Sequence, residues 1–152
     1  MILVVSVNGE GWLTGLRLAP ASAAGTATPW EPPDYADPAM FEEREVTLGT
    51  GSLAAAGTLS LPRRPVPVPG VALLAGSGPI DRDETLGPNK LFKDLAWGLA
   101  SRGIAVLRFD KVTYAYGPEL AKNRDFTPTA EHVPDGTAAV RLLRGLPEVD
   151  SR

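Results

Sequence analysis

The sequence contains no cysteine and a single histidine, His132, among its 152 residues. Disulfide bonds, thiolate metal sites and cysteine nucleophiles are therefore excluded within the chain, as is a metal site built from several histidines. His132 is also the only histidine in these residues that could serve a Ser-His-Asp triad. Composition alone therefore excludes cysteine-based catalysis and the common cysteine and multi-histidine metal sites within these residues.

Long apolar runs and clustered positive charge are lacking as well. The apolar run Ile2–Val5 is far too short to span a membrane, and the basic segment of a signal peptide does not precede it. The 15 Lys and Arg residues are outnumbered by 18 Asp and Glu residues, and no basic run exceeds Arg63-Arg64. Because nucleic-acid binding needs a positive patch, we expect no nucleic-acid partner. The short apolar run and the lack of a signal-peptide pattern lead us to expect no membrane partner and a cytoplasmic location.

The sequence does contain enough apolar material, 43% of residues, for a packed domain of ordinary size. Residues 1–18 predict two strands around an Asn8-Gly9 turn. Because two strands alone are marginal in water, we expect them to be the tail of a small preceding β-containing domain. The Pro- and Ala-rich residues 19–40 predict a linker, which assigns 41–152 to a second domain.

The second domain begins with antiparallel patterning and then changes. Residues 43–48 and 53–61 predict an antiparallel hairpin, and the Pro-rich residues 62–70 a rigid connector. The continuous apolar run 71–75 is typical of a strand buried on both faces.

Two helices and a second buried strand follow. The spacing predicts a helix over 90–102 with Asn89 as its N-cap and Gly103 past its end, then a strand over 104–109. The apolar stripe of that helix is formed by Leu91, Leu95 and Leu99. Pro134 is expected to begin the last helix. This order indicates an α/β fold with a parallel βαβ unit. A further parallel strand should follow, so we expect the chain to be a piece of a longer protein.

Ligand chemistry in such sheets lies in the loops after the strands, here 76–89 and 110–130. Gly76 and Gly78 would let the backbone approach a ligand closely, and amides in this position can face a developing negative charge. An ordinary βα turn is the alternative. A phosphate loop is not indicated, because Asp81 stands where G-x-G-x-x-G requires its third glycine.

Other candidate residues have structural interpretations that we favour. Asp81, Asp83 and Glu84 could hold a cation, but an EF-hand would need glycine at Leu86, and a structural ion pair of Arg82 explains the loop better.

Asp110 ends a buried strand and is expected to form a salt bridge or cap rather than a catalytic group. His132 is expected to be a surface or capping residue, because no G-x-S-x-G sequence supplies a nucleophile.

A family resemblance enters with two long segments. Residues 76–90 read GSGPIDRDETLGPNK and residues 92–111 read FKDLAWGLASRGIAVLRFDK. They resemble the early part of a bacterial α/β-hydrolase group that contains serine esterases related to dienelactone hydrolases and to serine aminopeptidase-like hydrolases. The resemblance covers roughly 41–152 and implies the N-terminal half of an α/β-hydrolase sheet. Residues 1–18 resemble the tail of a small domain that often precedes this hydrolase.

The resemblance implies one oxyanion-hole donor in this chain. Ser77 N–H is the best candidate, with Gly76 and Gly78 shaping the turn. The sequence departs from the group at Ala75, where relatives usually carry a histidine that helps to hold the loop. Two smaller departures are Phe109 for Tyr and Val112 for Arg.

The same resemblance places the nucleophile, the triad acid and the triad histidine beyond Arg152. It implies an ester or acyl hydrolase acting on a small molecule without a cofactor or metal, while the 152 residues alone are expected to be inactive. Without its triad, a serine hydrolase keeps at most about 10³–10⁴-fold acceleration over water. The alternatives are a non-catalytic hydrolase remnant that acts as a binding module and, disfavoured by the glycine spacing, a nucleotide-binding domain.

Overall fold

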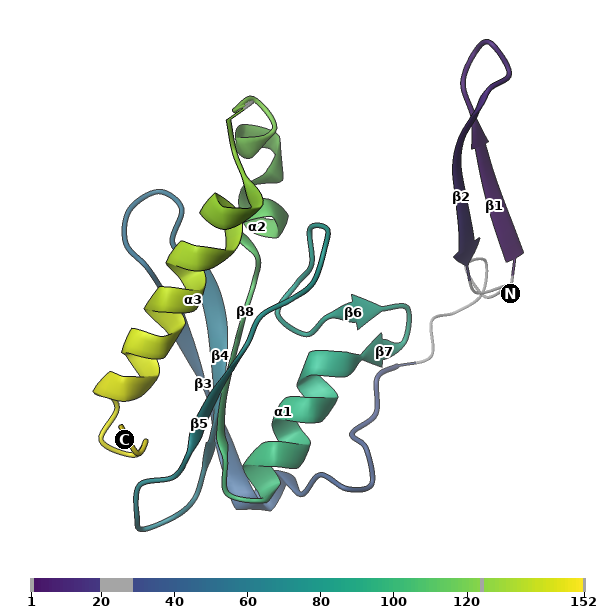
Figure 1. The fold of residues 1–152 in the computed structure, drawn as a ribbon. Coiled ribbons are helices and arrows are strands. Elements are labelled where there is room, and N and C mark those ends of the chain that lie inside the picture. Colours follow the sequence, from purple (N-terminus) through teal and green to yellow (C-terminus); the bar gives the residue numbers. More distant parts are fainter. Residues whose placement is uncertain (1, 20–28, 124, 152) are drawn as a thin grey trace. The chain divides into compact units, whose positions relative to one another are not determined.

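The computed structural model describes residues 2–19, 29–123 and 125–151 (Figure 1). The chain divides into two compact units, Met1–Trp30 and Glu31–Arg152. This division falls inside the predicted linker 19–40, of which residues 20–28 lie outside the described residues. The assignment of 1–18 and 41–152 to separate domains stays a prediction.

The first unit is a β-hairpin. Strand β1 (Ile2–Val7) pairs antiparallel with β2 (Leu13–Ala19), as the sequence predicted. The turn is closed by Asn8, whose side-chain Oδ1 accepts hydrogen bonds from the backbone N–H groups of Glu10 and Trp12 at 3.1 and 2.9 Å. A short polar side chain thereby satisfies the backbone donors of the turn.

The second unit is built on a four-stranded mixed sheet. Its strands are β3 (Phe41–Leu48), β4 (Ala55–Pro62), β5 (Gly70–Leu73) and β8 (Ala105–Phe109). They lie in the order β3-β4-β8-β5; β4 pairs antiparallel with β3 and β8, and β5 pairs parallel with β8. The predicted hairpin and βαβ unit are both confirmed.

Two long helices cover the sheet. Figure 1 shows α1 (Leu91–Ser101) and α3 (Pro128–Gly145) on either side of it. The core between α3 and the sheet contains the buried residues Leu48, Leu59, Leu107, Phe109, Ala139 and Leu143. None of the described helices is both long and apolar enough to cross a bilayer.

Four short elements complete the unit. They are the 3₁₀ turn η2 (Pro38–Met40), the two-residue strands β6 (Thr85–Leu86) and β7 (Asn89–Lys90), and helix α2 (Val112–Leu120). The sequence reading predicted none of them.

The expectation that residues 71–75 form a strand buried on both faces is wrong. Val71 is 37% exposed and Leu74 is 47% exposed. The reason is that β5 has the last place in the strand order, so only β8 pairs with it along Gly70–Leu73. An apolar run of this kind fits an edge strand as well as a central one.

Two details of the first long helix also differ. Asn89 does not cap α1 but belongs to β7, and the residue at the N-cap, Lys90, makes no side-chain capping bond. The leucine stripe is not the buried face: Leu91 and Leu95 are 60% and 43% exposed, while the small residue Ala96 is fully buried. The helix therefore contacts the sheet through small side chains. Its predicted end is confirmed, since Gly103 has a φ of +91°.

The last helix begins before Pro134. Its first residue is Pro128, and the Thr127 hydroxyl accepts a hydrogen bond from the N–H of Ala130, so Pro134 lies within the helix. A threonine cap followed by proline is a strong helix start, and it outweighs the later proline.

Val149 forms an isolated parallel β-bridge with Val68, in the segment that leads into β5. The N–H of Val68 donates to Glu148 O at 2.9 Å, and the N–H of Asp150 donates to Val68 O at 2.8 Å. Gly70 makes room for this contact, because a Cβ there would lie 2.8 Å from a methyl group of Val149. The segment after α3 is thereby held beside the segment that leads into β5.

Candidate functional site

The candidate site is the loop that follows β5, together with the residues that follow β8. Because the two strands are parallel, their carboxyl ends lie at the same edge of the sheet (Figure 1). This is the edge at which open α/β sheets bind ligands. The loop spans residues 74–84, and Asp110 and Lys111 come directly after β8.

The tip of the loop exposes its backbone. Gly76, Ser77 and Gly78 are exposed, whereas Ala75 is only 7% exposed. Gly78 has a φ of +95°, a conformation that favours glycine, although a Cβ would meet no atom within 4 Å. Glycine is thus needed there for backbone shape and not for space. The structure places all three predicted oxyanion residues together at this tip.

Lys111 binds the loop tip through both its side chain and its backbone. Its side chain is 3% exposed, and its Nζ donates to the carbonyl oxygen of Gly76 at 2.7 Å. The same ammonium forms an ion pair with Glu131 Oε1 at 3.1 Å. The backbone N–H of Lys111 also donates to Ile80 O at 3.2 Å.

Glu131 comes to Lys111 from α3. The Thr113 hydroxyl donates to its carboxylate, and His132 Nε2 lies 3.5 Å from its other oxygen. Burial alone would raise the pKa of Glu131, but the hydrogen bonds from Thr113 and Lys111 outweigh it and lower that pKa. The carboxylate therefore stays ionised beside the ammonium.

Arg82 and Asp110 form a second anchor. The N–H of Arg82 donates to Asp110 Oδ1 at 2.8 Å, and its guanidinium binds both carboxylate oxygens at 3.2 and 2.9 Å. The hydrogen bonds that Arg82 donates to Asp110 raise the pKa of Arg82, although burial opposes this. The structural interpretations of Arg82 and Asp110 are confirmed.

A third anchor crosses the sheet at Asp83. Its carboxylate accepts from Lys90 Nζ at 2.7 Å and from Arg108 Nε at 3.0 Å. Arg108, 3% exposed, also donates to Glu43 Oε1 at 2.8 Å and to Ser60 Oγ at 3.0 Å. Burial alone would raise the pKa of Asp83, but the bonds from Lys90 and Arg108 lower it.

Asp81, another acidic residue of the loop, also has hydrogen-bonding partners in the structure. Asp81 accepts hydrogen bonds from the N–H and the hydroxyl of Thr85 at 2.8 and 2.7 Å. Within residues 2–19, 29–123 and 125–151, no three histidine, cysteine or acidic side chains come together in a way that could hold a metal ion.

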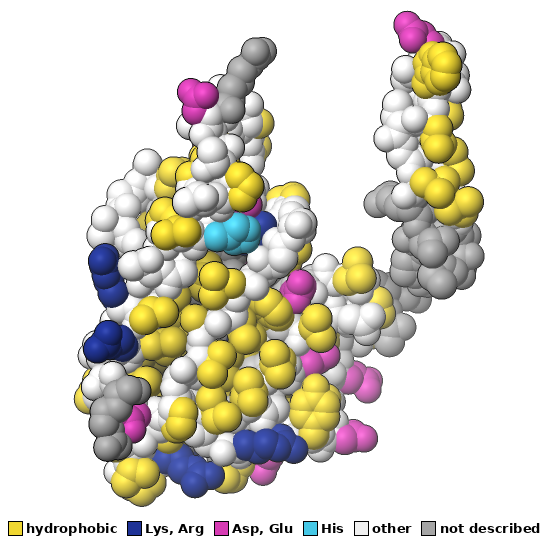
Figure 2. All heavy atoms as spheres, in the orientation of Figure 1, with side chains coloured by type: hydrophobic (Ala, Val, Ile, Leu, Met, Phe, Trp, Pro, Cys, Tyr) yellow, Lys and Arg dark blue, Asp and Glu magenta, His cyan; other side chains and the backbone are white. Residues whose placement is uncertain are grey.

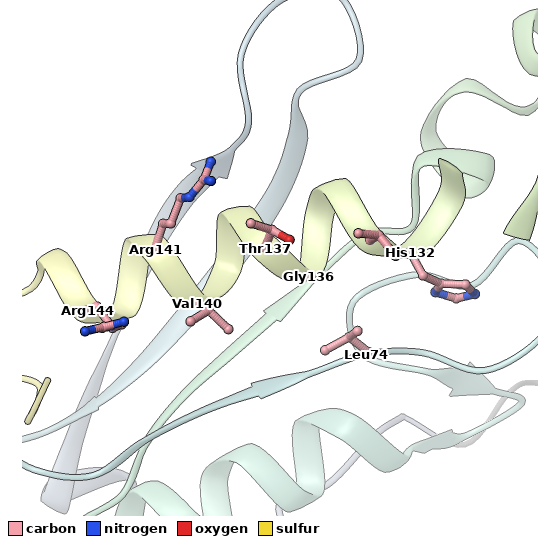
Figure 3. Close-up of a pocket in the computed structure, with 8 residues that line it drawn as sticks. Leu74, His132, Gly136, Thr137, Val140, Arg141 and Arg144 are labelled. Carbon is pink, nitrogen blue, oxygen red and sulfur yellow. The ribbon is translucent and has the colours of Figure 1, made fainter. Parts of the chain in front are cut away.

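A shallow groove of about 560 Å³ runs beside the end of β5. Its lining residues are Leu74, His132, Val133, Gly136, Thr137, Val140, Arg141 and Arg144. Figure 3 shows Leu74 facing α3, with His132 toward one end and Arg144 toward the other. His132 lies in the second turn of α3 and is 35% exposed, which agrees with the surface role expected for it.

The apolar surface continues beyond the groove. Figure 2 shows hydrophobic side chains gathered over the face between α3 and α1, along β5. The exposed apolar residues of these elements, together with Leu74 directly after β5, are Val71, Leu74, Leu91, Leu95, Val133 and Val140. Val149 bridges to Val68 just before β5.

Sequence reasoning missed Lys111, Glu131 and Arg108. One signal was available: charged residues stand within or directly after the buried strand β8, and a buried charge needs a partner. The identity of the partners depends on the fold.

No protein family's profile matches the chain. The chain is similar to Esterase EstD from Thermotoga maritima, with 40% identity over 141 residues, which are 93% of this chain and 32% of that protein. The chain thus spans about a third of the length of the curated relative that it matches. The similarity supports an esterase or hydrolase relationship, and the mixed sheet with its helices is compatible with the α/β class.

Proposed function

We propose that this chain forms the first part of an ester hydrolase of the α/β-hydrolase fold, within the group of serine esterases related to dienelactone hydrolases. Ser77 N–H is the proposed oxyanion-hole donor, and a small-molecule ester is the proposed substrate. The observation that carries the proposal is the exposed Gly76–Gly78 backbone at the carboxyl end of a parallel strand, in a chain 40% identical to an esterase over 141 residues.

The sheet supports this assignment. Two antiparallel strands precede a parallel pair, and Val149 forms an isolated parallel bridge with Val68 in the segment that leads into β5. A strand continued in that direction would reach the same edge as Gly76–Gly78. A serine on the turn after such a strand would then face the loop, as a nucleophile elbow requires. The proposed triad therefore lies outside these residues.

The chemistry asked of the loop is electrostatic. When a serine attacks an ester carbonyl, the carbonyl oxygen becomes an oxyanion that backbone N–H groups can bind at about 2.7–3.1 Å. An exposed amide at the tip of an anchored loop is suited to this task because it needs no reorganisation. Removing one such donor from a serine hydrolase lowers kcat by about 10²–10³-fold.

The test uses the complete product of the gene and two substitutions at one position. Ser77→Pro removes the N–H and Ser77→Ala keeps it. We expect Ser77→Ala to hydrolyse p-nitrophenyl acetate at close to the wild-type rate and Ser77→Pro to lose about 10²–10³-fold in kcat. Circular dichroism and thermal unfolding check that both variants fold.

Two results would contradict the proposal. Equal kcat values for Ser77→Pro and wild type would refute the role of the Ser77 amide. A complete gene product without ester hydrolysis would refute the enzyme and favour a non-catalytic binding module. The 152-residue chain alone is expected to be inactive, and a rate that scales with its concentration and is abolished by a serine-directed fluorophosphonate would contradict that expectation.

A further inference from the structure

We propose that Lys111 is the positioning residue of the loop tip: its ammonium fixes the Gly76–Ser77 peptide so that Ser77 N–H faces outward. The catalytic role of the Ser77 N–H rests on the proposed function, whereas its positioning by Lys111 does not. Its structural basis is the 2.7 Å hydrogen bond from Lys111 Nζ to Gly76 O.

The geometry of the peptide bond carries the argument. In a trans peptide the C=O of one residue and the N–H of the next point in opposite directions, and the described residues contain no cis peptide bond. Because the buried ammonium holds Gly76 O on the inner side of the loop, Ser77 N–H must point to the other side. Ser77 itself is exposed, so this direction leads away from the core.

The burial of Lys111 makes the contact hard to replace. An ammonium that is 3% exposed loses most of its hydration and is stable only with close partners. The described partners are the Gly76 carbonyl and the Glu131 carboxylate, which the Thr113 hydroxyl holds in place. A rotation of the Gly76–Ser77 peptide would remove one of these partners.

Lys111 also holds the far side of the tip. Its backbone N–H binds Ile80 O, so one residue fixes the segment at positions 76 and 80. The anchors at Arg82 and Asp83 act beyond this segment and do not reach Gly76. The side chain of Ala75 cannot form a hydrogen bond. Among the described contacts, the Lys111 ammonium is the side-chain group that binds the Gly76 carbonyl oxygen.

The first experiment uses this chain and needs no activity. Lys111→Met keeps the length of the side chain and removes its charge, and Lys122→Met, at an exposed lysine, is the matched control. We expect Lys111→Met to shift the NMR resonances of the Gly76 carbonyl carbon and the Ser77 amide, because the Gly76 carbonyl loses its hydrogen-bond donor and the peptide is free to rotate. Unchanged resonances at both atoms in a folded Lys111→Met chain would overturn the proposal.

The second experiment uses the complete gene product. We expect Lys111→Met to lower kcat for p-nitrophenyl acetate about 10- to 100-fold with KM changed less than about two-fold, because a displaced donor forfeits part of what a removed donor loses. Lys111→Arg is expected to recover part of the loss and Lys122→Met to match wild type. An unchanged kcat in Lys111→Met would overturn the proposal.

If Lys111→Met does not fold, a second variant, Glu131→Gln, tests the proposal. Glu131→Gln keeps a hydrogen-bond acceptor but removes the charge beside the ammonium, and it is expected to shift the same two resonances to a smaller extent. If Glu131→Gln leaves them in place, the proposal fails. If the wild-type gene product hydrolyses no ester, the proposed function fails, and the NMR experiment still decides the positioning role.

Discussion

Arg108 lies in the most deeply buried strand of the sheet, yet it carries a full positive charge. The buried charge of Arg108 is stabilised by three hydrogen-bond acceptors, on Asp83, Glu43 and Ser60, at 2.8–3.0 Å. Replacing a whole buried ion pair by apolar residues is often harmless, but removing one member leaves an uncompensated charge. The loop residue Asp83 is therefore coupled to the stability of the sheet.

We expect Asp83→Asn to lower the free energy of unfolding by about 2–4 kcal/mol, because it removes the charge between Arg108 and Lys90. The exposed Asp34→Asn is the matched control, with an expected change within about 0.5 kcal/mol. Urea unfolding at pH 7 measures both. Equal stability of the two variants would contradict the coupling.

The same pair predicts a pH dependence. The folded-state pKa of Asp83 is lowered from 3.8, so its stabilisation is present above that pH and is lost as the pH falls through the folded-state value. The difference between wild type and Asp83→Asn should therefore shrink below about pH 4. A difference that stays constant down to pH 2 would argue against an ionised Asp83.

At the scale of the side chain, only part of the site was predictable from the sequence. Gly76, Ser77 and Gly78 stand out because glycines directly after an apolar run are a local signal. Lys111 does not, because its role exists only when α3 brings Glu131 against it.

The elements differ in how far local pattern determines them. The β3–β4 hairpin, α1 and β8 follow from alternation, from spacing and from a short apolar run, all of which act over a few residues. Helix α2 was missed because Gly117 and Pro118 lie inside it and its backbone departs from helical geometry at Tyr116. The exposure of β5 was mispredicted because strand order, and not residue type, decides it.

The loop between β5 and α1 depends on one backbone conformation. Gly78→Ala should destabilise the chain by about 1–2 kcal/mol, because an L-residue is strained at a φ of +95°. Gly76→Ala is the matched control: its Cβ would also meet no atom within 4 Å, and its φ is not positive. Thermal unfolding compares the two. A loss as large for Gly76→Ala would show that the strain at Gly78 is not the cause.

At the scale of the whole molecule, the exposed apolar flank of β5 is the feature that governs association with other chains. An edge strand with unpaired N–H and C=O groups invites pairing with another chain, and Val71 places an exposed apolar side chain on it. Charged residues on an edge oppose such pairing.

We therefore expect the 152-residue chain to self-associate as its concentration rises, and Val71→Lys to reduce this. Val66→Lys, at a 60% exposed residue in the connector before β5, is the matched control and should leave it unchanged. Sedimentation velocity across a concentration series measures the effect. Equal association of both variants would mean that the edge of β5 is not involved.

The strand order has a further consequence for synthesis. β5 precedes α1 and β8 in the chain, yet β8 separates it from the β3–β4 hairpin in the sheet. At roughly 5–20 residues per second, a ribosome needs roughly 2–7 s to proceed from Leu73 to Phe109. The hairpin can close during that interval, whereas β5 must wait for a partner that has not yet been made. For those seconds its backbone is open to a chaperone or to a neighbouring nascent chain.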